Sequence, residues 1–395
     1  SSHFSSNHFN SGCSGFLLRS AIAADLRFEL HATMSEMLLG AALAALGGLL
    51  WAFGSLGKRM GVEGATNDLK QIRATCTAFV YALTTLLIPS INFCVTPFDD
   101  LKRTFGNPEW TCRIPFILLC GVVSGFGNVF GALAFAYSAG ENSALISMVE
   151  NGTYTAAGAL IIAVWNQEQP PPTHWIAGTL IMLGIISSQG SFGIRRRLGI
   201  GLGKSEPEDS EWACVESDFN GESDESEDSG SDTESLVSPP RLRKRAVAFA
   251  VAGGVCWGFG PLGKKHGVSD APEGLDQAWT TSTYFIYMCC TNIPPIVAIL
   301  FADGAKRRAC FEDIRFLKLL LGVFVCWAIA GLGGLVSTYA FAKAEDFGAV
   351  ISMIENGVYT VFGALLISLM YREAITLRQL MAAGLIVLGV CIAAV

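Results

Sequence analysis

Ile146–Ile162 reads ISMVENGTYTAAGALII, and 205 residues later Ile351–Ile367 reads ISMIENGVYTVFGALLI, identical at 12 of 17 positions. A second pair of segments shows the same relationship. Gly47–Val62 reads GGLLWAFGSLGKRMGV and Gly253–Val268 reads GGVCWGFGPLGKKHGV, identical at 10 of 16 positions. Shared apolar composition alone would give far fewer matches, so the chain contains an internal repeat.

Both copies lie in a chain with the composition of a membrane protein. Of its 395 residues, 51% are hydrophobic and 15% are charged, whereas soluble domains are about 25% charged. This balance excludes a soluble enzyme, a nucleic-acid-binding protein and a secreted disulfide-rich module. Crossing a hydrocarbon layer of about 30 Å takes about 20 apolar residues. Ten such runs occur, at 37–57, 75–95, 114–137, 143–165, 174–192, 246–263, 279–301, 316–342, 347–369 and 377–395.

These runs fall into two halves, residues 37–192 and 246–395, with five runs in each. Because five is odd, the second half must enter the membrane upside down relative to the first. We therefore predict an all-α polytopic membrane protein with ten transmembrane helices, arranged as two inverted five-helix repeats. Inverted repeats with a site near the membrane midplane are an architecture of secondary transporters. A duplication that serves packing alone is the alternative.

The segment between the halves, residues 193–245, has a different composition. Ser205–Ser235 holds 13 of the 34 acidic residues and no Lys or Arg, so it cannot bury enough apolar surface to fold. We predict a disordered acidic linker. Ser229 and Ser231 each have an acidic residue three positions on and are candidates for a regulatory kinase, although a solvated connection is the simpler alternative. The Ser-rich segment 1–36 is also predicted to be disordered.

The repeated segments place polar residues on one helix face inside the membrane. Glu150, Asn151 and Tyr154 share a face by their spacing, and the second copy repeats the pattern. An ionisable group at this depth faces the protein interior or a water-filled cavity. We predict a substrate site formed by Glu150, Asn151, Tyr154, Glu355, Asn356, Tyr359, Trp51, Trp257 and Asn128. Hydrogen bonds that merely join the helices are the alternative, and a repeated Glu would also suit a proton-coupled cycle.

A lysine follows each repeated Trp. Trp51, Ser55 and Lys58 share a helix face by their spacing, as do the corresponding residues of the second copy, in which Pro261 is expected to kink the helix. We predict that Lys58 and Lys264 act as gating residues or attract anions. The alternative is that they extend to the membrane surface, which is common for Lys at a helix end.

Several kinds of chemistry find no support in the sequence. The 12 Cys include no CxxC pair and no His partners at metal spacing, so neither a metal site nor a cofactor is expected. Residues 258–263 match GxGxxG, but they lie in a span with no preceding strand. The spans contain no HExxH, GxSxG or paired-Asp motif. We therefore do not expect an enzyme.

The chain resembles the drug/metabolite transporter superfamily, close to its EamA-like and sugar-porter branches, over residues 38–192 and 246–395. The Trp-x2-Gly-x2-Gly-Lys ending of the first span is similar to bacterial glucose/ribose and rhamnose carriers. One departure is the Asn-Gly that follows each repeated Glu, where family members often carry Pro. The residues with the spacing of the family's Glu-x2-Thr-x2-Gln ending are Glu373, Thr376, Gln379 and Gly389, with Glu168 and Gly184 in the first copy.

The resemblance implies a ten-helix carrier with a central cavity lined mainly by spans 1, 3, 4, 6, 8 and 9. Its expected function is transport of a small organic solute, such as a sugar or an amino acid, by alternating access. Because the repeated lysines lie at span ends, a strongly anionic solute is not expected. Two other functions remain open, namely an ion channel or divalent-cation carrier on the same fold and a non-transporting membrane scaffold.

Charge counting predicts the orientation and the partners. Loops after spans 1, 3, 5, 7 and 9 carry 19 of the 27 Lys and Arg, and the other face with the termini carries 8. The positive-inside rule then places the acidic linker in the cytosol and both termini outside. The expected partners are a small-molecule solute and the lipid bilayer, and no nucleic acid. A homodimer and a kinase acting on the linker are open alternatives.

Overall fold

The computed structural model describes residues 11–138, 143–165, 167, 172–188, 240–373 and 377–393. Every element in this part of the chain is a helix. The first half contains α1 (Ser11–Gly61), α2 (Lys70–Val95), α3 (Phe98–Gly106), α4 (Pro108–Thr111), α5 (Ile114–Tyr137), α6 (Ser143–Trp165) and α7 (Pro172–Ser188). The second contains α9 (Pro240–Trp257), α10 (Phe259–Val268), α11 (Asp276–Thr291), α12 (Ile293–Leu300), α13 (Gly304–Glu312), α14 (Ile314–Lys343), the 3₁₀ turn η1 (Glu345–Phe347), α15 (Gly348–Tyr371) and α16 (Leu377–Ala393).

Seven helical stretches of the described chain are long and apolar enough to cross a membrane. Leu83, Leu321 and Leu369 are among the large apolar side chains exposed along them, as expected where lipid covers the surface. The chain is therefore a multi-pass integral membrane protein. The stretches are Ser35–Gly61, Lys70–Val95, Pro108–Tyr137, Lys244–Val268, Asp276–Leu300, Ile314–Lys343 and Gly348–Tyr371, with shorter apolar helices at Trp175–Gly184 and Gln379–Gly389.

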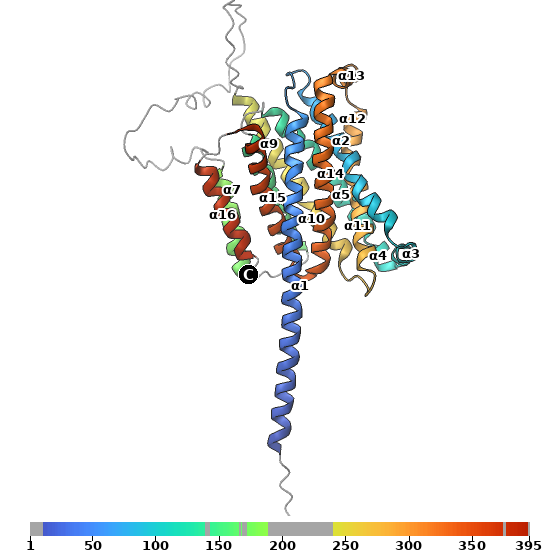
Figure 1. The fold of residues 1–395 in the computed structure, drawn as a ribbon, viewed down its shortest axis with the longest axis vertical. Coiled ribbons are helices and arrows are strands. Elements are labelled where there is room, and N and C mark those ends of the chain that lie inside the picture. Colours follow the sequence, from blue (N-terminus) through green and yellow to red (C-terminus); the bar gives the residue numbers. More distant parts are fainter. Residues whose placement is uncertain are drawn as a thin grey trace, which may run out of the picture.

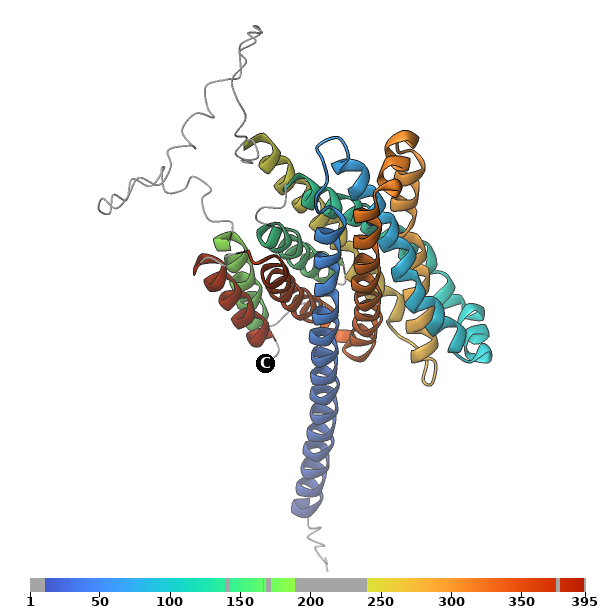
Figure 2. The ribbon, with the colours of Figure 1, turned by 45° about the horizontal axis from the view of Figure 1, so that its top comes forward.

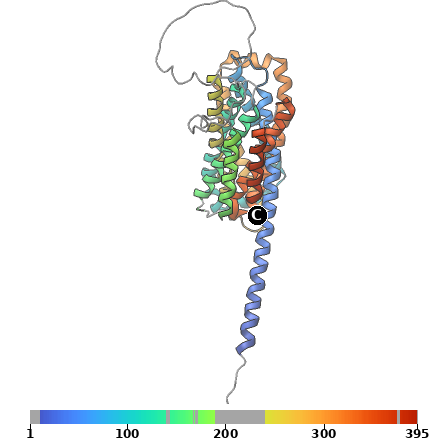
Figure 3. The same ribbon diagram turned by 90° about the vertical axis from the view of Figure 1, so that its left-hand side faces the viewer.

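The two halves pack against each other in a reciprocal pattern. Helix α1 packs on α14 and α15, and α9 packs on α5 and α6. Contacts between α6 and α15 and between α7 and α16 also join the halves. In Figure 1, α1 runs upward through the bundle, whereas α9 begins near the top and runs downward. Figure 2 shows α7 and α16 side by side at one edge of the bundle, and Figure 3, viewed from that edge, shows them side by side in front.

Small residues bring the helices of the two halves close together. A Cβ atom at Gly333 would lie 2.8 Å from the carbonyl oxygen of Gly47, where α14 crosses α1. One at Gly127 would lie 2.9 Å from the carbonyl oxygen of Gly253, where α5 crosses α9. Glycine allows such close approach of two backbones. The repeated Gly-Gly segments are therefore among the points at which each half docks on the other.

Two spans of the second half are interrupted. Helix α9 ends at Trp257 and α10 starts at Phe259, so the helix breaks a few residues before Pro261, where a kink was predicted. Because Pro261 has no N–H, it cannot bond the carbonyl four residues earlier. A similar break separates α11 from α12 at Asn292, just before Pro294 and Pro295.

The N-terminal segment differs from the prediction. Residues 11–36, expected to be disordered, form the first part of α1, and Figure 1 shows this part extending below the bundle. The stretch contains no Pro and is rich in Ala and Leu, which have high helix propensity. Local propensity therefore outweighs the Ser-rich composition that suggested disorder. The acidic Ser205–Ser235, with Ser229 and Ser231, lies outside the described residues.

Candidate functional site

A buried ion pair occupies the same position in each half. Lys58 of α1 pairs with Glu150 of α6, and their side chains are each 1% exposed. Lys264 of α10 pairs with Glu355 of α15, with 3.3 Å between Nζ and Oε1 and side chains 2% and 1% exposed. Burying an unpaired charge is very costly, and an opposite charge in contact offsets much of that cost. The two pairs together carry no net charge when ionised.

The lysines therefore lie in the protein interior. Lys58 is in the last turn of α1, yet its ammonium group faces Glu150 and lies 5.7 Å from the centre of the Trp257 ring. The alternative in which Lys58 and Lys264 extend to the membrane surface does not match this geometry, because helix position alone does not show which way a long side chain turns. Lys264 also donates a hydrogen bond of 2.6 Å to Ser337 Oγ.

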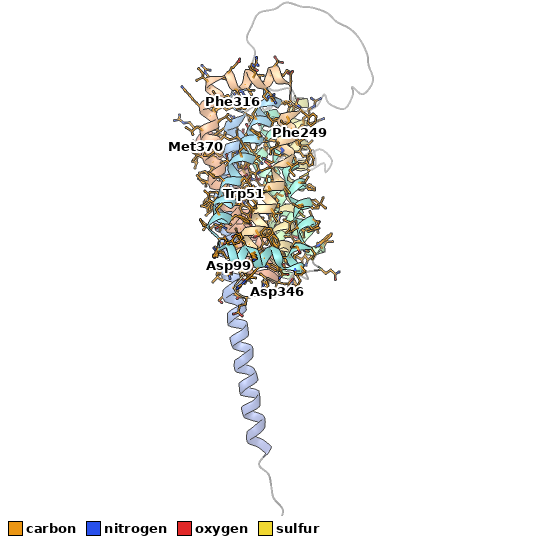
Figure 4. The ribbon with its side chains drawn as sticks, turned by 90° about the vertical axis from the view of Figure 1, so that its right-hand side faces the viewer. Trp51, Asp99, Phe249, Phe316, Asp346 and Met370 are labelled. Carbon is orange, nitrogen blue, oxygen red and sulfur yellow. The ribbon has the colours of Figure 1, made fainter. Side chains whose placement is uncertain are left out.

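Four aromatic rings lie between the two halves, and each ring contacts two of the others. Trp51 and Trp257 have ring centres 6.0 Å apart, and Trp257 and Tyr154 have centres 6.3 Å apart. Tyr154 contacts Tyr359 at 6.5 Å, and Tyr359 contacts Trp51 at 6.5 Å. We call these four rings the aromatic quartet. Each half contributes one Trp and one Tyr at repeated positions, and Figure 4 shows Trp51 midway along the bundle.

A chain of hydrogen bonds links the quartet to the repeated asparagine of the first half. Asn151 donates to Ser55 Oγ at 3.2 Å and to Ser147 Oγ at 3.1 Å. Ser55 Oγ in turn donates to the Tyr359 hydroxyl at 3.1 Å. In the second half, Asn356 donates to Ser352 Oγ at 3.2 Å. Pro261 stands where the first half has Ser55, so the hydroxyl that would extend this second chain is missing.

Several polar atoms at this centre are buried without a hydrogen-bond partner in the described chain. They include the second carboxylate oxygen, Oε2, of both Glu150 and Glu355, and the indole nitrogens of Trp51 and Trp327. Buried polar atoms are nearly always paired in proteins, so each exception needs an explanation. Carboxylate oxygens accept hydrogen bonds and an indole N–H donates one. A polar solute that carries both donors and acceptors would satisfy them.

Asn128 lies in a different setting. It is fully buried, and its amide donates to the Ala78 carbonyl at 3.3 Å. This bond ties α5 to α2. Of the nine residues predicted to bind the solute, the other eight belong to the aromatic quartet, the ion pairs or their hydrogen-bond chains.

Sequence reasoning missed several aromatic residues beside the quartet. The Tyr81 ring lies 6.0 Å from Trp257 and 4.2 Å from Trp327, measured between ring centres. Tyr81 could have been found, because Thr-x-Thr-x-Phe-x-Tyr at Thr75–Tyr81 recurs at Thr281–Tyr287. Trp327 could not, because its counterpart in the first half is Gly121.

Within the described residues, no group of three or more His, Cys, Asp or Glu side chains could hold a metal ion.

Comparisons with known proteins reveal a likeness of fold. No protein-family model matches the chain, and no curated protein matches it in sequence. A solved structure titled "Crystal structure of protein" matches with a TM-score of 0.50 and 14% sequence identity, covering 91% of this chain and 96% of that one. At 14% sequence identity, the match indicates a similar fold and says nothing about function.

Proposed function

We propose that the protein is a secondary transporter of a small, electrically neutral organic solute, such as a sugar or a zwitterionic amino acid. It works by alternating access on a fold of ten transmembrane helices in two inverted repeats. Membership of the drug/metabolite transporter superfamily is part of this proposal and rests on the sequence motifs.

The inverted arrangement is supported by the order and packing of the helices. Equivalent helices α1 and α9 run in opposite directions (Figure 1), and each packs on the corresponding helices of the other half. Two similar halves that dock reciprocally can exchange conformations, which opens the centre first to one side of the membrane and then to the other.

The observation that carries the proposal is the pair of buried ion pairs around one aromatic quartet. Ionisable residues inside a membrane bundle are costly and by default mark a functional site. Here both copies of the repeat keep a Lys–Glu pair, and one oxygen of each Glu has no hydrogen-bond partner among the described residues. A duplication that served packing alone would not need charges at its centre, because apolar residues would fill the same space at lower cost.

The balance of charge supports the solute class. Lys58 and Lys264 are matched by Glu150 and Glu355, so a solute with a net charge would leave an uncompensated charge in a poorly solvated centre. A neutral solute with several hydroxyl groups, or a zwitterion, avoids that cost.

Uptake into proteoliposomes tests the proposal. Purified wild type is compared with Glu150→Gln/Glu355→Gln across a panel of labelled sugars, amino acids and organic anions, with and without a pH gradient. We expect saturable uptake of one neutral class and its loss in the double variant. Stimulation by the pH gradient would add proton coupling. Absence of uptake from folded protein would contradict the proposal, and ion currents would then support a channel.

A further inference from the structure

The two ion pairs differ in the residue beside them. Helices α5 and α14 align through the Ala-Phe-Ala at 134–136 and 340–342, which sets Gly131 opposite Ser337. In the first half, a Cβ atom at Gly131 would run into both Lys58 Nζ and Glu150 Oε1. Glycine therefore leaves room for the direct contact between those two side chains.

In the second half, a hydroxyl group occupies that space. Lys264 Nζ lies 2.6 Å from Ser337 Oγ but 3.3 Å from Glu355 Oε1. Hydrogen bonds between an ammonium group and a carboxylate are usually about 2.7–2.9 Å long, so the closer partner of Lys264 is the serine. Ser337 is fully buried, and its contact with Lys264 does not involve Glu355.

The two halves consequently differ in the free energy needed to separate the Lys and the Glu of their ion pair. If Glu150 turned away, the partner of Lys58 seen among the described residues would be the Trp257 ring at 5.7 Å, a weak substitute for a carboxylate in a buried site. If Glu355 turned away, Lys264 would keep its hydrogen bond to Ser337. The second pair is therefore the one that can separate without leaving a buried ammonium group unpaired.

We propose that the solute binds between Lys264 and Glu355 and that Ser337 is the positioning residue that makes this possible. This inference rests on the proposed transport function. Ser337 holds Lys264 while Glu355 turns to the solute, and the Lys58–Glu150 pair stays closed as part of the scaffold. The solute offers a hydrogen-bond acceptor to Lys264 and a donor to Glu355, as a pair of neighbouring hydroxyl groups does, and as a zwitterion does.

Uptake kinetics of single variants give the first test. Ser337→Gly should raise the KM for the solute roughly tenfold or more, the usual scale for a lost hydrogen bond to a charged group. Ser337→Thr keeps the hydroxyl and should restore the KM. Thr338→Val is the matched control, because Thr338 is equally buried and its hydroxyl donates to the Gly334 carbonyl of its own helix at 2.8 Å. Size-exclusion profiles confirm that each variant is folded.

Exchanging the two side chains gives the second test. In wild type, Glu355→Gln should raise the KM, whereas Glu150→Gln should mainly lower the maximal rate. In the exchanged background Gly131→Ser/Ser337→Gly, the two results should be reversed. There, Glu150→Gln should raise the KM, and Glu355→Gln should mainly lower the maximal rate. If the wild type takes up the solute, two results would overturn this inference but not the transport function. One is an equal rise in KM for the two single Glu variants, and the other is a KM for Ser337→Gly that matches the KM for Thr338→Val. Absence of wild-type uptake would overturn the transport function and this inference together.

Discussion

At the scale of single residues, the centre of the molecule holds two Lys–Glu pairs that are buried almost completely. Such pairs are poor evidence for stability, because desolvation of both ions consumes most of their attraction. Removing one partner is a different matter, since the remaining charge has no water to solvate it.

Lys58→Met should therefore destabilise the protein by about 3–5 kcal/mol, because Glu150 is left unpaired in the interior. Lys58→Met/Glu150→Leu should lose much less, since no charge is stranded. The exposed pair Lys343–Asp276, with side chains 42% and 49% exposed, is the control, and Lys343→Met should cost about 0–1 kcal/mol. Thermal unfolding in detergent measures all three. Equal losses in the single and double variants would contradict this account.

The unpaired indole of Trp51 gives a second prediction. Trp51→Phe keeps an aromatic ring in the quartet but removes the N–H that has no partner within the described chain. We expect the KM for the solute to rise several-fold. Trp110→Phe is the control, because the Trp110 indole donates to Thr283 Oγ1 at 3.4 Å, away from the quartet. It should lower the melting temperature and leave the KM unchanged. If Trp51→Phe lowered the melting temperature and left the KM unchanged, Trp51 would have a packing role instead.

The sequence pattern could identify many residues of this centre, but it could not show which Lys pairs with which Glu. The helical spacing of Glu150, Asn151 and Tyr154 was enough to place them on one face. Nothing in that spacing shows that Lys58, far away in the chain and at a helix end, folds back onto Glu150. Such a contact depends on where α1 and α6 lie within the folded bundle, which is a property of tertiary packing.

At the scale of helices, close crossings of small residues hold the bundle together. The crossing of α14 over α1 brings Gly333 against the backbone of Gly47. Gly333→Ala should destabilise the protein by about 1–3 kcal/mol, because the neighbouring atom is backbone and cannot move aside easily. Gly384→Ala is the control, since in the described chain no atom beyond the neighbouring residues and backbone of its own helix lies within 4 Å of a Cβ added at Gly384 of α16. That change should stabilise by up to about 1 kcal/mol. Similar melting temperatures for both variants would contradict the role of the crossing.

The predicted spans and the observed helices agree well where the apolar run is clear. Helix α5 covers 114–137 and α6 covers 143–165, as predicted from hydropathy. The breaks at Gly258 and Asn292 were not fully foreseen. Pro261 signalled a kink, but a proline disturbs the turn before it, so the interruption falls earlier in the chain.

At the scale of the whole molecule, the distribution of Lys and Arg predicts a cytosolic linker and external termini. Cys112, between α4 and α5, is exposed and lies at the start of the Pro108–Tyr137 stretch, after the connection that follows the second span, so it should face the outside. A membrane-impermeant maleimide should label it in sealed right-side-out vesicles, and Cys112→Ser should abolish that label. Labelling of Cys112 only after the vesicles are opened would reverse the orientation.

Cys310 of α13 serves as an internal control for that experiment. It is fully buried, and burial raises the pKa of its thiol above the ordinary value. Because the thiolate is the reactive form, Cys310 should stay unlabelled at neutral pH even in opened vesicles, and its reactivity should rise only at alkaline pH. Strong labelling at pH 7 would show that α13 opens locally.

The central claim is that two similar halves carry one solute by alternating access through the paired centre. Counterflow in proteoliposomes tests it most directly. Vesicles preloaded with unlabelled solute should take up labelled solute faster than empty vesicles, and Glu150→Gln/Glu355→Gln should abolish the acceleration. If uptake by the wild type were the same in preloaded and empty vesicles and did not saturate, a channel would account for the data and the alternating-access account would be wrong.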